Sequence, residues 1–293
     1  MHFDVQLIAG GLAIGSVYGS IALGLVLIYR STGILNFAQG EMATFTTYIG
    51  WTLVNTVGLP YWVGFALAVL IALGLGAAVE RAVIRPVSKQ PHLTVVIVTL
   101  GLFLLFNSLS LKFWHSDVRP FRSPFPDRSL HVFGAYISWV SIGIFGVSLL
   151  SMAFIAAIFR FTKVGLAMRA VTSNPTASAL MGINNGRILS LGWGLAAAVG
   201  AVAGMLAANR LLLDPNMMQG VLLYAFAAAV IGGMTSPVGA VIGGLIMGVT
   251  NALVSSVSWI GTELSLAATF IVLVIILLIR PQGLFGRRAE VRV

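Results

Sequence analysis

Residues 160–187 read RFTKVGLAMRAVTSNPTASALMGINNGR and lie between two long apolar runs, residues 137–159 and 188–208. The segment carries four basic residues and no acidic one. Each flanking run is long enough to cross the hydrocarbon core of a bilayer, which takes about 20 apolar residues. We therefore predict two membrane-spanning helices joined by a polar loop that lies in water and has a partner there.

Composition extends this prediction to the whole chain. Of its 293 residues, 58% are hydrophobic and 9% are charged, and the mean hydropathy is +1.00. Soluble domains carry about 25% charged residues. We predict a single domain, residues 1–293, with an all-α integral membrane fold. This fold is a polytopic bundle of about eight or nine transmembrane helices of about 20 residues each.

Nine apolar runs mark the predicted spans: residues 5–29, 37–57, 61–79, 93–111, 137–159, 188–208, 219–233, 237–257 and 262–279. The seventh run has about 15 residues, which rise only about 22 Å as a helix. Residues 219–257 are therefore expected to form either a hairpin of half-helices or one broken element.

The basic residues orient these spans, because loops rich in Lys and Arg stay on the cytoplasmic side of a membrane. With the N-terminus outside and nine crossings, the inner loops and the C-terminal tail hold most of the 17 basic residues. The inner set is Arg30, Arg81, Arg85, Lys89, Arg160, Lys163, Arg169, Arg187, Arg280, Arg287, Arg288 and Arg292, and the outer set is Lys112, Arg119, Arg122, Arg128 and Arg210. Because these basic residues orient the helices, the net charge of +9 does not require a nucleic-acid partner.

Residue types needed for bond chemistry are sparse. The chain has no cysteine and no Gly-Lys dipeptide, so thiol chemistry and a phosphate-binding loop of the Walker type are excluded. The four histidines, His2, His92, His115 and His131, show no metal-ligand spacing. We predict no catalytic, cofactor-binding or metal-binding residue on this chain.

Polar residues inside apolar runs are costly in lipid and are therefore candidates for function. The pattern Asn-x-x-Gln-Gly occurs at 36–40 and again at 216–220, and each copy opens an apolar span. The predicted topology places the first copy on the inner side and the second on the outer side, as in an inverted repeat whose broken helices meet near a central pathway. The candidate lining of a translocation path is Asn36, Gln39, Gly40, Glu41, Asn216, Gln219 and Gly220.

Three roles are open for Glu41, which has no partner three or four residues away in its own helix. It lines a substrate path, pairs with a cation from another helix, or caps the helix start, where the helix dipole favours a carboxylate. Asn107 and Asn251, in other apolar runs, either face a pore or form interhelical hydrogen bonds.

Glycine spacing and the largest outer loop complete the outline. Glycines four residues apart predict helix faces that pack closely in lipid. They are Gly11 with Gly15 and Gly19, Gly200 with Gly204, and Gly239 with Gly243.

The outer loop, residues 112–136, is expected to form an ordered external turn or a short helix that is either a docking surface or a plain connector.

Within residues 160–187, we predict two short helical pieces interrupted at Asn174-Pro175, with Asn174 as the cap of the second piece. Ala177, Leu180 and Met181 would lie along one side of this second piece, with Arg169 at the rim. An amphipathic element of this kind either docks into a groove of a partner protein or lies at the lipid interface.

Five segments are spread along nearly the full length of the chain, in the order NFAQGEM, ERAVIRPVSKQPHLTVVIVTLG, GLAMRAVTSNPTASALMGIN, PVGAVIGGLIMG and RPQGLFGR. Together they resemble the permease subunit of the branched-chain amino acid ABC importer family, in its smaller form. The resemblance implies a second homologous permease, two cytoplasmic ATPase subunits that bind the ATP, an extracytoplasmic substrate-binding protein and a location in the bacterial inner membrane. One departure is Gln39, where the family usually has a histidine, and this argues against a proton-related role at that position.

The resemblance also implies that residues 160–187 are a cytoplasmic coupling loop whose helix docks into an ATPase. The implied coupling residues are Gly165, Arg169, Ala170, Asn174, Ala177, Leu180, Met181 and Gly182.

We expect a permease that is not an enzyme and forms half of the translocation pathway for branched-chain or related amino acids. One alternative is a permease of the same family for urea, short amides or other small polar solutes. Another is an ion-coupled secondary transporter or channel, which would need titratable groups in mid-membrane, where Glu41 is the one candidate. A membrane enzyme is disfavoured by the missing catalytic and metal-binding groups.

Overall fold

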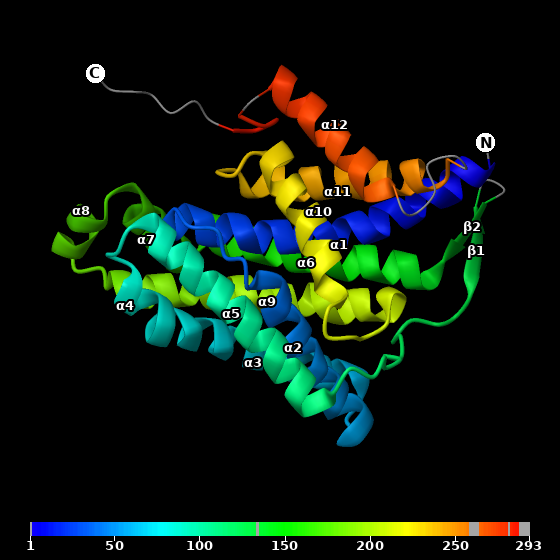
Figure 1. The fold of residues 1–293 in the computed structure, drawn as a ribbon, viewed down its shortest axis with the longest axis horizontal. Coiled ribbons are helices and arrows are strands. Elements are labelled where there is room, and N and C mark those ends of the chain that lie inside the picture. Colours follow the sequence, from blue (N-terminus) through cyan, green and yellow to red (C-terminus); the bar gives the residue numbers. More distant parts are fainter. Residues whose placement is uncertain (1, 133–134, 258–263, 281, 287–293) are drawn as a thin grey trace.

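The computed structural model describes residues 2–132, 135–257, 264–280 and 282–286 (Figure 1). Its helices are α1 (His2–Thr32), α2 (Gln39–Trp51), α3 (Tyr61–Val79), α4 (Arg85–Val87), α5 (His92–Trp114), α6 (Trp139–Phe161), α7 (Lys163–Ser173), α8 (Pro175–Leu180), α9 (Asn185–Leu211), α10 (Met217–Gly232), α11 (Pro237–Ser255) and α12 (Ser265–Ile279). The π-helical turns η1 (Thr52–Thr56) and η2 (Glu80–Ile84) continue α2 and α3, and strands β1 (Ser129–Val132) and β2 (Ala135–Ser138) lie between α5 and α6.

Within the described ranges, six helices are long and apolar enough to cross a membrane: α1, α3 with its extension to Val87, α5, α6, α9 and α11. Helices α10 and α12 are apolar but shorter. Each predicted span coincides with a helix whose ends differ by a few residues, although residues 262–263 of the last span lie outside the described residues. The helical membrane fold is confirmed, and the count of eight or nine crossings stays a prediction because α2, α10 and α12 are short.

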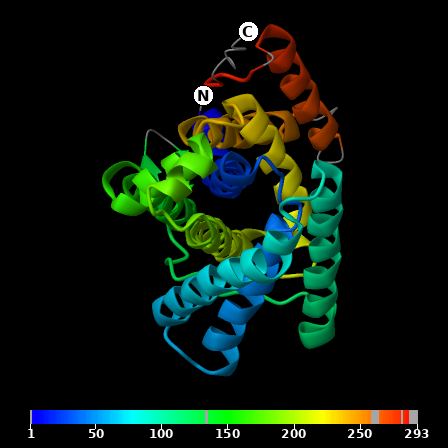
Figure 2. The same ribbon diagram turned by 90° about the vertical axis from the view of Figure 1, so that its left-hand side faces the viewer.

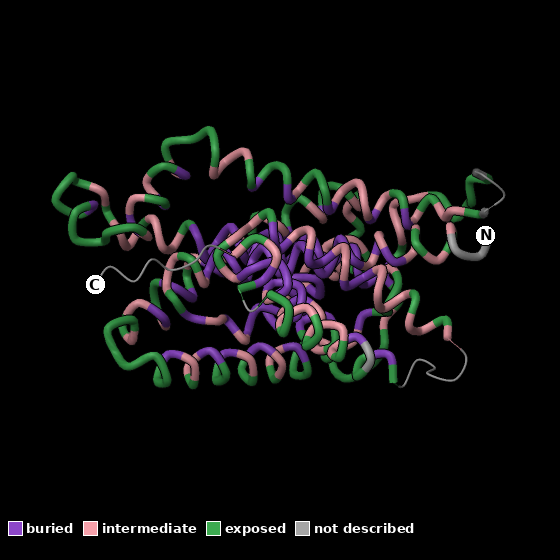
Figure 3. The backbone as a smooth tube through the Cα atoms, turned by 90° about the horizontal axis from the view of Figure 1, so that it is seen from above, coloured by how far each residue is buried: buried purple, intermediate pink, exposed green. Residues whose placement is uncertain are grey.

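Helices α1 and α9 form the centre of the bundle. Their most apolar windows are 89% and 78% buried, against 28% for α5 and 22% for α6. Figure 2, which looks along the bundle, shows α1 and α9 in the middle, α6 on one side, and α5 and α12 on the opposite side. Figure 3 shows the buried residues gathered at the centre of the molecule and exposed residues at its margins. The outer helices therefore present apolar side chains to the surroundings of the bundle, as lipid requires.

The predicted glycine faces allow the backbones of neighbouring helices to come into close contact. Gly11 and Gly15 of α1 lie against the backbone of Gly248 in α11, and Gly19 faces Val241 of the same helix. A Cβ atom added to Gly11 would lie 2.9 Å from the Cα of Val249 in α11, closer than real Cβ atoms approach. Because lipid gives no hydrophobic drive for helix association, this close approach supplies the van der Waals contact that holds the two helices together.

The loop after α5 contains a β-hairpin and not the short helix that was one of its two predicted forms. Residues 112–136 contain no helix beyond the end of α5 at Trp114 among their described positions, and β1 pairs with β2 as an antiparallel hairpin. The backbone of Arg119 also pairs with that of Leu213, at N–O distances of 2.9 and 3.0 Å, which ties this loop to the segment between α9 and α10. The physical reason is that an extended loop satisfies its backbone groups by pairing with other extended segments.

Residues 219–257 form two separate helices, α10 and α11, and not one broken element. Helix α11 is long enough for a full span and is not a half-helix, and the number of crossings in this region stays a prediction. The turn between α10 and α11 contains Gly233, whose φ of 98° is rarely adopted by residues with a side chain. Ser236 then caps α11, and its hydroxyl accepts a hydrogen bond from the Gly239 amide at 3.0 Å.

The described loops separate into two sets at opposite ends of the bundle. The N-terminus and the β1–β2 hairpin lie at one end, and α4, α7 and α8 lie at the other (Figure 1). This separation matches the predicted grouping of inner and outer loops. Arg287, Arg288 and Arg292 of the predicted inner set lie outside the described residues.

Two glycines of α3 give a matched test of the packing. A Cβ atom on Gly76 would lie 2.5 Å from the carbonyl oxygen of Trp193, whereas one on the exposed Gly74 would meet nothing within 4 Å. We expect Gly76→Ala to lower the free energy of unfolding by about 1–3 kcal/mol because it overpacks the α3–α9 contact. Gly74→Ala should be neutral or stabilising by up to about 1 kcal/mol, since alanine favours a helix. Thermal unfolding in detergent distinguishes them, and equal stability of the two variants would contradict this packing.

Candidate functional site

Both Asn-x-x-Gln-Gly turns start a helix, and the first starts inside the bundle. After α1 ends at Thr32, the chain turns inward and α2 begins at Gln39, which is fully buried. The side-chain amide of Gln39 donates a hydrogen bond to the carbonyl oxygen of Ala196, in the interior of α9, at 2.8 Å. A Cβ atom on Gly24, well within α1, would lie 2.9 Å from the same amide nitrogen. Helix α2 thus starts beside the middle of the two central helices.

The two turns share a local hydrogen-bond pattern. In each turn, the Gln backbone N–H donates to the Asn carbonyl three residues earlier, at 3.3 Å from Gln39 to Asn36 and 2.9 Å from Gln219 to Asn216. The side chains of each pair also bond to each other, at 3.2 Å in the first turn and 2.9 Å in the second. The donor is Asn36 in the first turn and Gln219 in the second.

Helix packing around the two turns is also similar. Helix α2 packs against α9, and α10 packs against α1; likewise α3 packs against α9, and α11 packs against α1. These are the neighbours that an inverted repeat requires, and the repeat itself stays a prediction.

A cluster of four polar side chains joins the two halves of the bundle. Asn107 of α5 donates to Oε2 of Glu41 at 3.2 Å and to Oδ1 of Asn216 at 3.0 Å. Gln219 of α10 donates to Oε1 of Glu41 at 3.3 Å. We call Glu41, Asn107, Asn216 and Gln219 the amide–carboxylate cluster. Both carboxylate oxygens of Glu41 accept from amides of neighbouring helices, so its hydrogen-bond partners are not the cation that one alternative proposed.

The amide–carboxylate cluster opens onto the side of the bundle. Glu41 is fully buried, Asn107 and Gln219 are partly buried, and Asn216 is exposed. Gly220 is also exposed, and a Cβ atom there would meet nothing within 4 Å. This arrangement supplies hydrogen-bond donors and acceptors at a surface between α5 and α10, without a nucleophile or a metal site.

The structure therefore brings together Glu41, Asn216 and Gln219 of the predicted path residues. Asn36 and Gln39 are fully buried and bond to each other and to α9, away from the cluster. Gly40 is a contact point between helices, because its Cβ would lie 3.3 Å from the Leu222 side chain of α10. Asn107 was not among the predicted path residues, although its place in an apolar run had left a pore-facing role open for it.

Interhelical hydrogen bonding is also confirmed for Asn251. Its Oδ1 accepts from the Tyr224 hydroxyl of α10 at 3.1 Å, and its Nδ2 donates to the Tyr18 hydroxyl of α1 at 3.5 Å. The two tyrosine rings stack with centroids 4.9 Å apart. Asn251 thus holds three helices together.

The polar loop that follows α6 forms a fixed projection. Helix α7 ends at Ser173 and α8 begins at Pro175, as the sequence predicted, and the Asn174 side chain accepts from the Ala177 amide at 2.9 Å. Ser178 donates to the Asn185 side chain at 2.9 Å, and Asn185 donates back to the Pro175 carbonyl at 2.8 Å. These bonds attach α8 to the start of α9.

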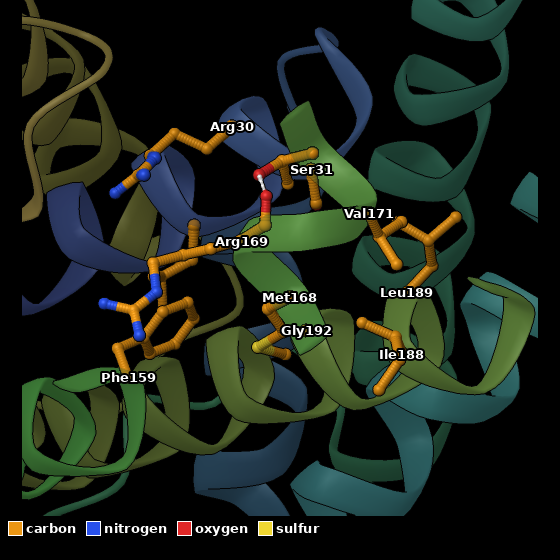
Figure 4. A pocket seen from close by; sticks show the side chains of 11 residues that line it. Arg30, Ser31, Phe159, Met168, Arg169, Val171, Ile188, Leu189 and Gly192 are labelled. Atoms are coloured by element: carbon orange, nitrogen blue, oxygen red, sulfur yellow. Dashed lines mark hydrogen bonds between the residues drawn. The ribbon is translucent and has the colours of Figure 1, made fainter. Parts of the chain in front are cut away.

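The predicted coupling residues divide into three groups. Ala177, Leu180 and Met181 lie on the exposed tip, where Leu180 and Met181 are 84% and 82% exposed. Gly165 is buried at the corner between α6 and α7, and Gly182 ends α8 with a φ of 82°. Arg169, Ala170 and Asn174 lie on α7 or at its end, and the Arg169 side chain lines a pocket with Arg30 of α1 (Figure 4).

An ion pair anchors the base of this projection. Arg85 donates to the buried carboxylate of Glu80 at 2.6 and 3.2 Å, and to the carbonyl of Gly186 and the hydroxyl of Ser190 at 2.7 Å each. Ser190 also donates to Glu80 at 2.5 Å. Two-point contact between Arg and a carboxylate fixes geometry as well as charge, so it holds the end of α3 against the start of α9.

Comparison with known proteins places this arrangement in a family. Residues 7–278 match the family described as the branched-chain amino acid transport system permease component. The chain belongs to this family. It is 33% identical to the high-affinity branched-chain amino acid transport system permease protein LivH of Salmonella typhimurium, over 97% of this chain and 96% of that protein. It is 30% identical to the permease protein BraD of Pseudomonas aeruginosa, over 98% and 96%.

More distant similarity extends to other permeases. The ribose import permease protein RbsC of Escherichia coli is 29% identical over 80% of this chain and 74% of its own length. The solved structure of PsaBC from Streptococcus pneumoniae in complex with a Fab has the same fold, with a TM-score of 0.50, 14% identity and coverage of 96% of this chain and 93% of that one. The family assignment makes this chain a multi-pass ABC transporter permease.

Asn107 gives a direct test of the cluster. Asn107→Ala removes the donor that α5 supplies to the buried Glu41 carboxylate, and we expect it to lower the free energy of unfolding by about 1–3 kcal/mol. Ser108→Ala, at the adjacent exposed position of α5, should change it by less than about 0.5 kcal/mol. Denaturation of the purified chain in detergent measures both. Identical effects at the two positions would show that the cluster contributes nothing to stability.

Proposed function

We propose that this chain forms half of the translocation pathway of an ATP-driven importer for branched-chain or related amino acids. The family match and the printed functions of its relatives support this. The observation that carries the proposal is the amide–carboxylate cluster, because it presents polar groups on the side of a bundle that is otherwise adapted to lipid. Such groups are costly in hydrocarbon and are found facing water-filled cavities or other protein.

The path runs along the face that α5, α10 and α12 form. Two of these helices carry exposed apolar side chains, including Leu104 of α5, which is 64% exposed, and Ile271 of α12, which is 60% exposed. A second homologous permease covers this face, so the cluster faces the central pathway between the two permeases. Its amides and carboxylate then offer hydrogen bonds to a small zwitterionic solute in transit.

Energy comes from ATP bound by two separate cytoplasmic ATPase subunits, and the tip of α8 docks into one of them. Exposed apolar side chains on a short rigid helix suit a groove in a partner protein. The attachment of α8 to Asn185 passes any movement of the tip to α9. Helix α9 in turn holds the start of α2 through the bond between Ala196 and Gln39, two residues before Glu41. This route links the ATPase contact to the cluster through one helix.

Substrate choice lies mainly with an extracytoplasmic binding protein. Relatives that import ribose, and xylose or arabinose, carry similar permease chains, so the permease tolerates different solutes. Urea, short amides and other small polar solutes are therefore the alternative substrates, and ligand binding by the cognate binding protein decides among them. In this arrangement the N-terminus is outside, the C-terminus is cytoplasmic and the chain lies in the inner membrane.

The ATPase contact is tested by placing a charge on the tip of α8. We expect Leu180→Asp to weaken co-purification with the ATPase subunits at least about tenfold, since burial of an unpaired carboxylate in an apolar contact costs more than about 1.4 kcal/mol. Thr176→Asp adds the same charge in the first turn of α8, where the helix dipole tolerates it, and should leave the complex intact. Retention of the ATPase by the Leu180→Asp chain would contradict docking at this tip.

The pathway is tested by uptake into liposomes that contain the full complex. Gln219→Leu removes a donor to Glu41 and should lower ATP-dependent uptake at least about tenfold while the complex still assembles, because a lost polar contact to a charged group is worth about 1.5–3 kcal/mol. Leu223→Met, one turn further along α10, should retain uptake. Uptake by this chain alone, driven by an ion gradient, would overturn the proposal in favour of a secondary transporter.

A further inference from the structure

A basic cavity lies at the end of the bundle that carries α7 and α8. It has a volume of about 1060 Å³ and is lined by the end of α1, the end of α7 and the turn before α11. Arg30 and Arg169 contribute positive charge, and Ser31, Thr172 and Ser236 contribute hydroxyl groups. None of the described residues that line it is acidic. The cavity thus has the charge and the hydrogen-bonding groups that suit an anion.

The two arginines extend to the same side of the pocket. Figure 4 shows a neighbouring pocket that shares Arg30, Ser31, Arg169 and Thr172 with this cavity, and in it the side chains of Arg30 and Arg169 lie on one side while Val171, Ile188 and Leu189 lie on the other. Phe159 of α6 lies beneath the Arg169 guanidinium group. The polar and apolar sides of this region are therefore separated.

An apolar crevice lies next to the cavity. It has a volume of about 60 Å³ and lies between α6 and α11, with α1 behind it. Leu23 and Leu27 of α1 form its floor, and Met152 and Ile155 of α6 form one wall; these side chains are all at least 96% buried. Pro237 lines both the crevice and the basic cavity, so the two lie next to each other.

We propose that this cavity and crevice bind an anionic glycerophospholipid. The phosphate lies between Arg30 and Arg169, and the part of an acyl chain nearest the glycerol enters the crevice. From Pro237 to Val241 the crevice follows about 6 Å of helix, which is four residues at about 1.5 Å each, so the rest of the chain lies in the surrounding bilayer. This site differs from the transport path, which faces α5 and α12 on the opposite side of the bundle.

The combination of features favours a lipid over a free anion. Basic pockets between transmembrane helices at the cytoplasmic side are sites where anionic headgroups bind. A free phosphate would use the arginines but would leave the adjoining crevice without a role. A bound lipid would bridge α7 to α1 and α11, and would thus restrain the loop that carries α8. The inference takes the cytoplasmic location of this end from the proposed function but does not depend on transport, because binding can be measured without it.

The test measures lipid bound to the full chain in detergent by native mass spectrometry. The probes are phosphatidylglycerol and phosphatidylcholine with identical acyl chains. We expect preferential retention of phosphatidylglycerol, and the double variant Arg30→Gln with Arg169→Gln should weaken it about 30-fold, at about 1 kcal/mol for each cation. The matched control, Arg160→Gln with Lys163→Gln, removes two cations from the same loop outside the cavity and should weaken it less than about threefold, since exposed charges are screened.

A second pair of variants tests the crevice. Ala156 is an exposed residue of α6 that lines the crevice, and Ala153 is exposed one turn earlier and does not line it. Ala156→Trp should fill the crevice and weaken phosphatidylglycerol binding about fivefold, which corresponds to the burial of one or two CH₂ groups at about 0.8 kcal/mol each. Ala153→Trp should leave it unchanged.

Three results would overturn the proposal. The first is equal retention of phosphatidylcholine and phosphatidylglycerol. The second is an equal loss of binding in the two double variants, which would mean that only net charge matters. The third is full displacement of phosphatidylglycerol by inorganic phosphate together with no effect of Ala156→Trp, which would assign the cavity to a free anion.

Discussion

Every backbone polar group within a bilayer must find its partner inside the protein, and this constraint governs how α2 begins. A helix that starts in the bundle interior leaves its first backbone amides and the preceding turn without water. Here the turn satisfies itself: the Asn36 side chain accepts from the Ala38 amide at 3.1 Å, and Gln39 donates to α9. Because these bonds reach from α2 to α9, the start of α2 is fixed to the centre of the bundle. Glu41 is thereby placed next to α5 and α10.

The same constraint explains why the amide–carboxylate cluster joins three helices. A buried carboxylate is stable when several donors point at it, and Asn107 and Gln219 supply these from two other helices. Asn216 then accepts from both amides. Each residue of the cluster holds neighbouring segments together and also supplies polar atoms. This dual role suits a pathway that must be held in place between transport steps and still offer hydrogen bonds to a solute.

The sequence allowed prediction of the helices and of several of their contacts. Long apolar runs predicted the spans, the glycine spacing predicted the closely packed face of α1 but not its partner α11, and Asn174-Pro175 predicted the break between α7 and α8. These features depend on local periodicity and backbone chemistry, which a sequence displays directly. The contacts of Glu41 could not be predicted, because its donors lie 66 and 178 residues away and depend on how the helices cross. The pocket that Arg169 and Arg30 line together, and the β1–β2 hairpin, likewise depend on tertiary neighbours.

The glycine contact between α1 and α11 has a consequence for movement. Helices separated by side chains can shift past one another as rotamers change, but backbones in direct contact have no such freedom. Gly15 lies against Gly244 and Gly248, and further along Gly19 lies against Gly244. Helices α1 and α11 therefore move together as one rigid unit. Any change of shape during a transport cycle takes place in the helices that lack this backbone contact, α5 and α12 among them. A lipid in the α6–α11 crevice would touch this pair of helices at Leu23 and Leu27 of α1 and at Val241 of α11.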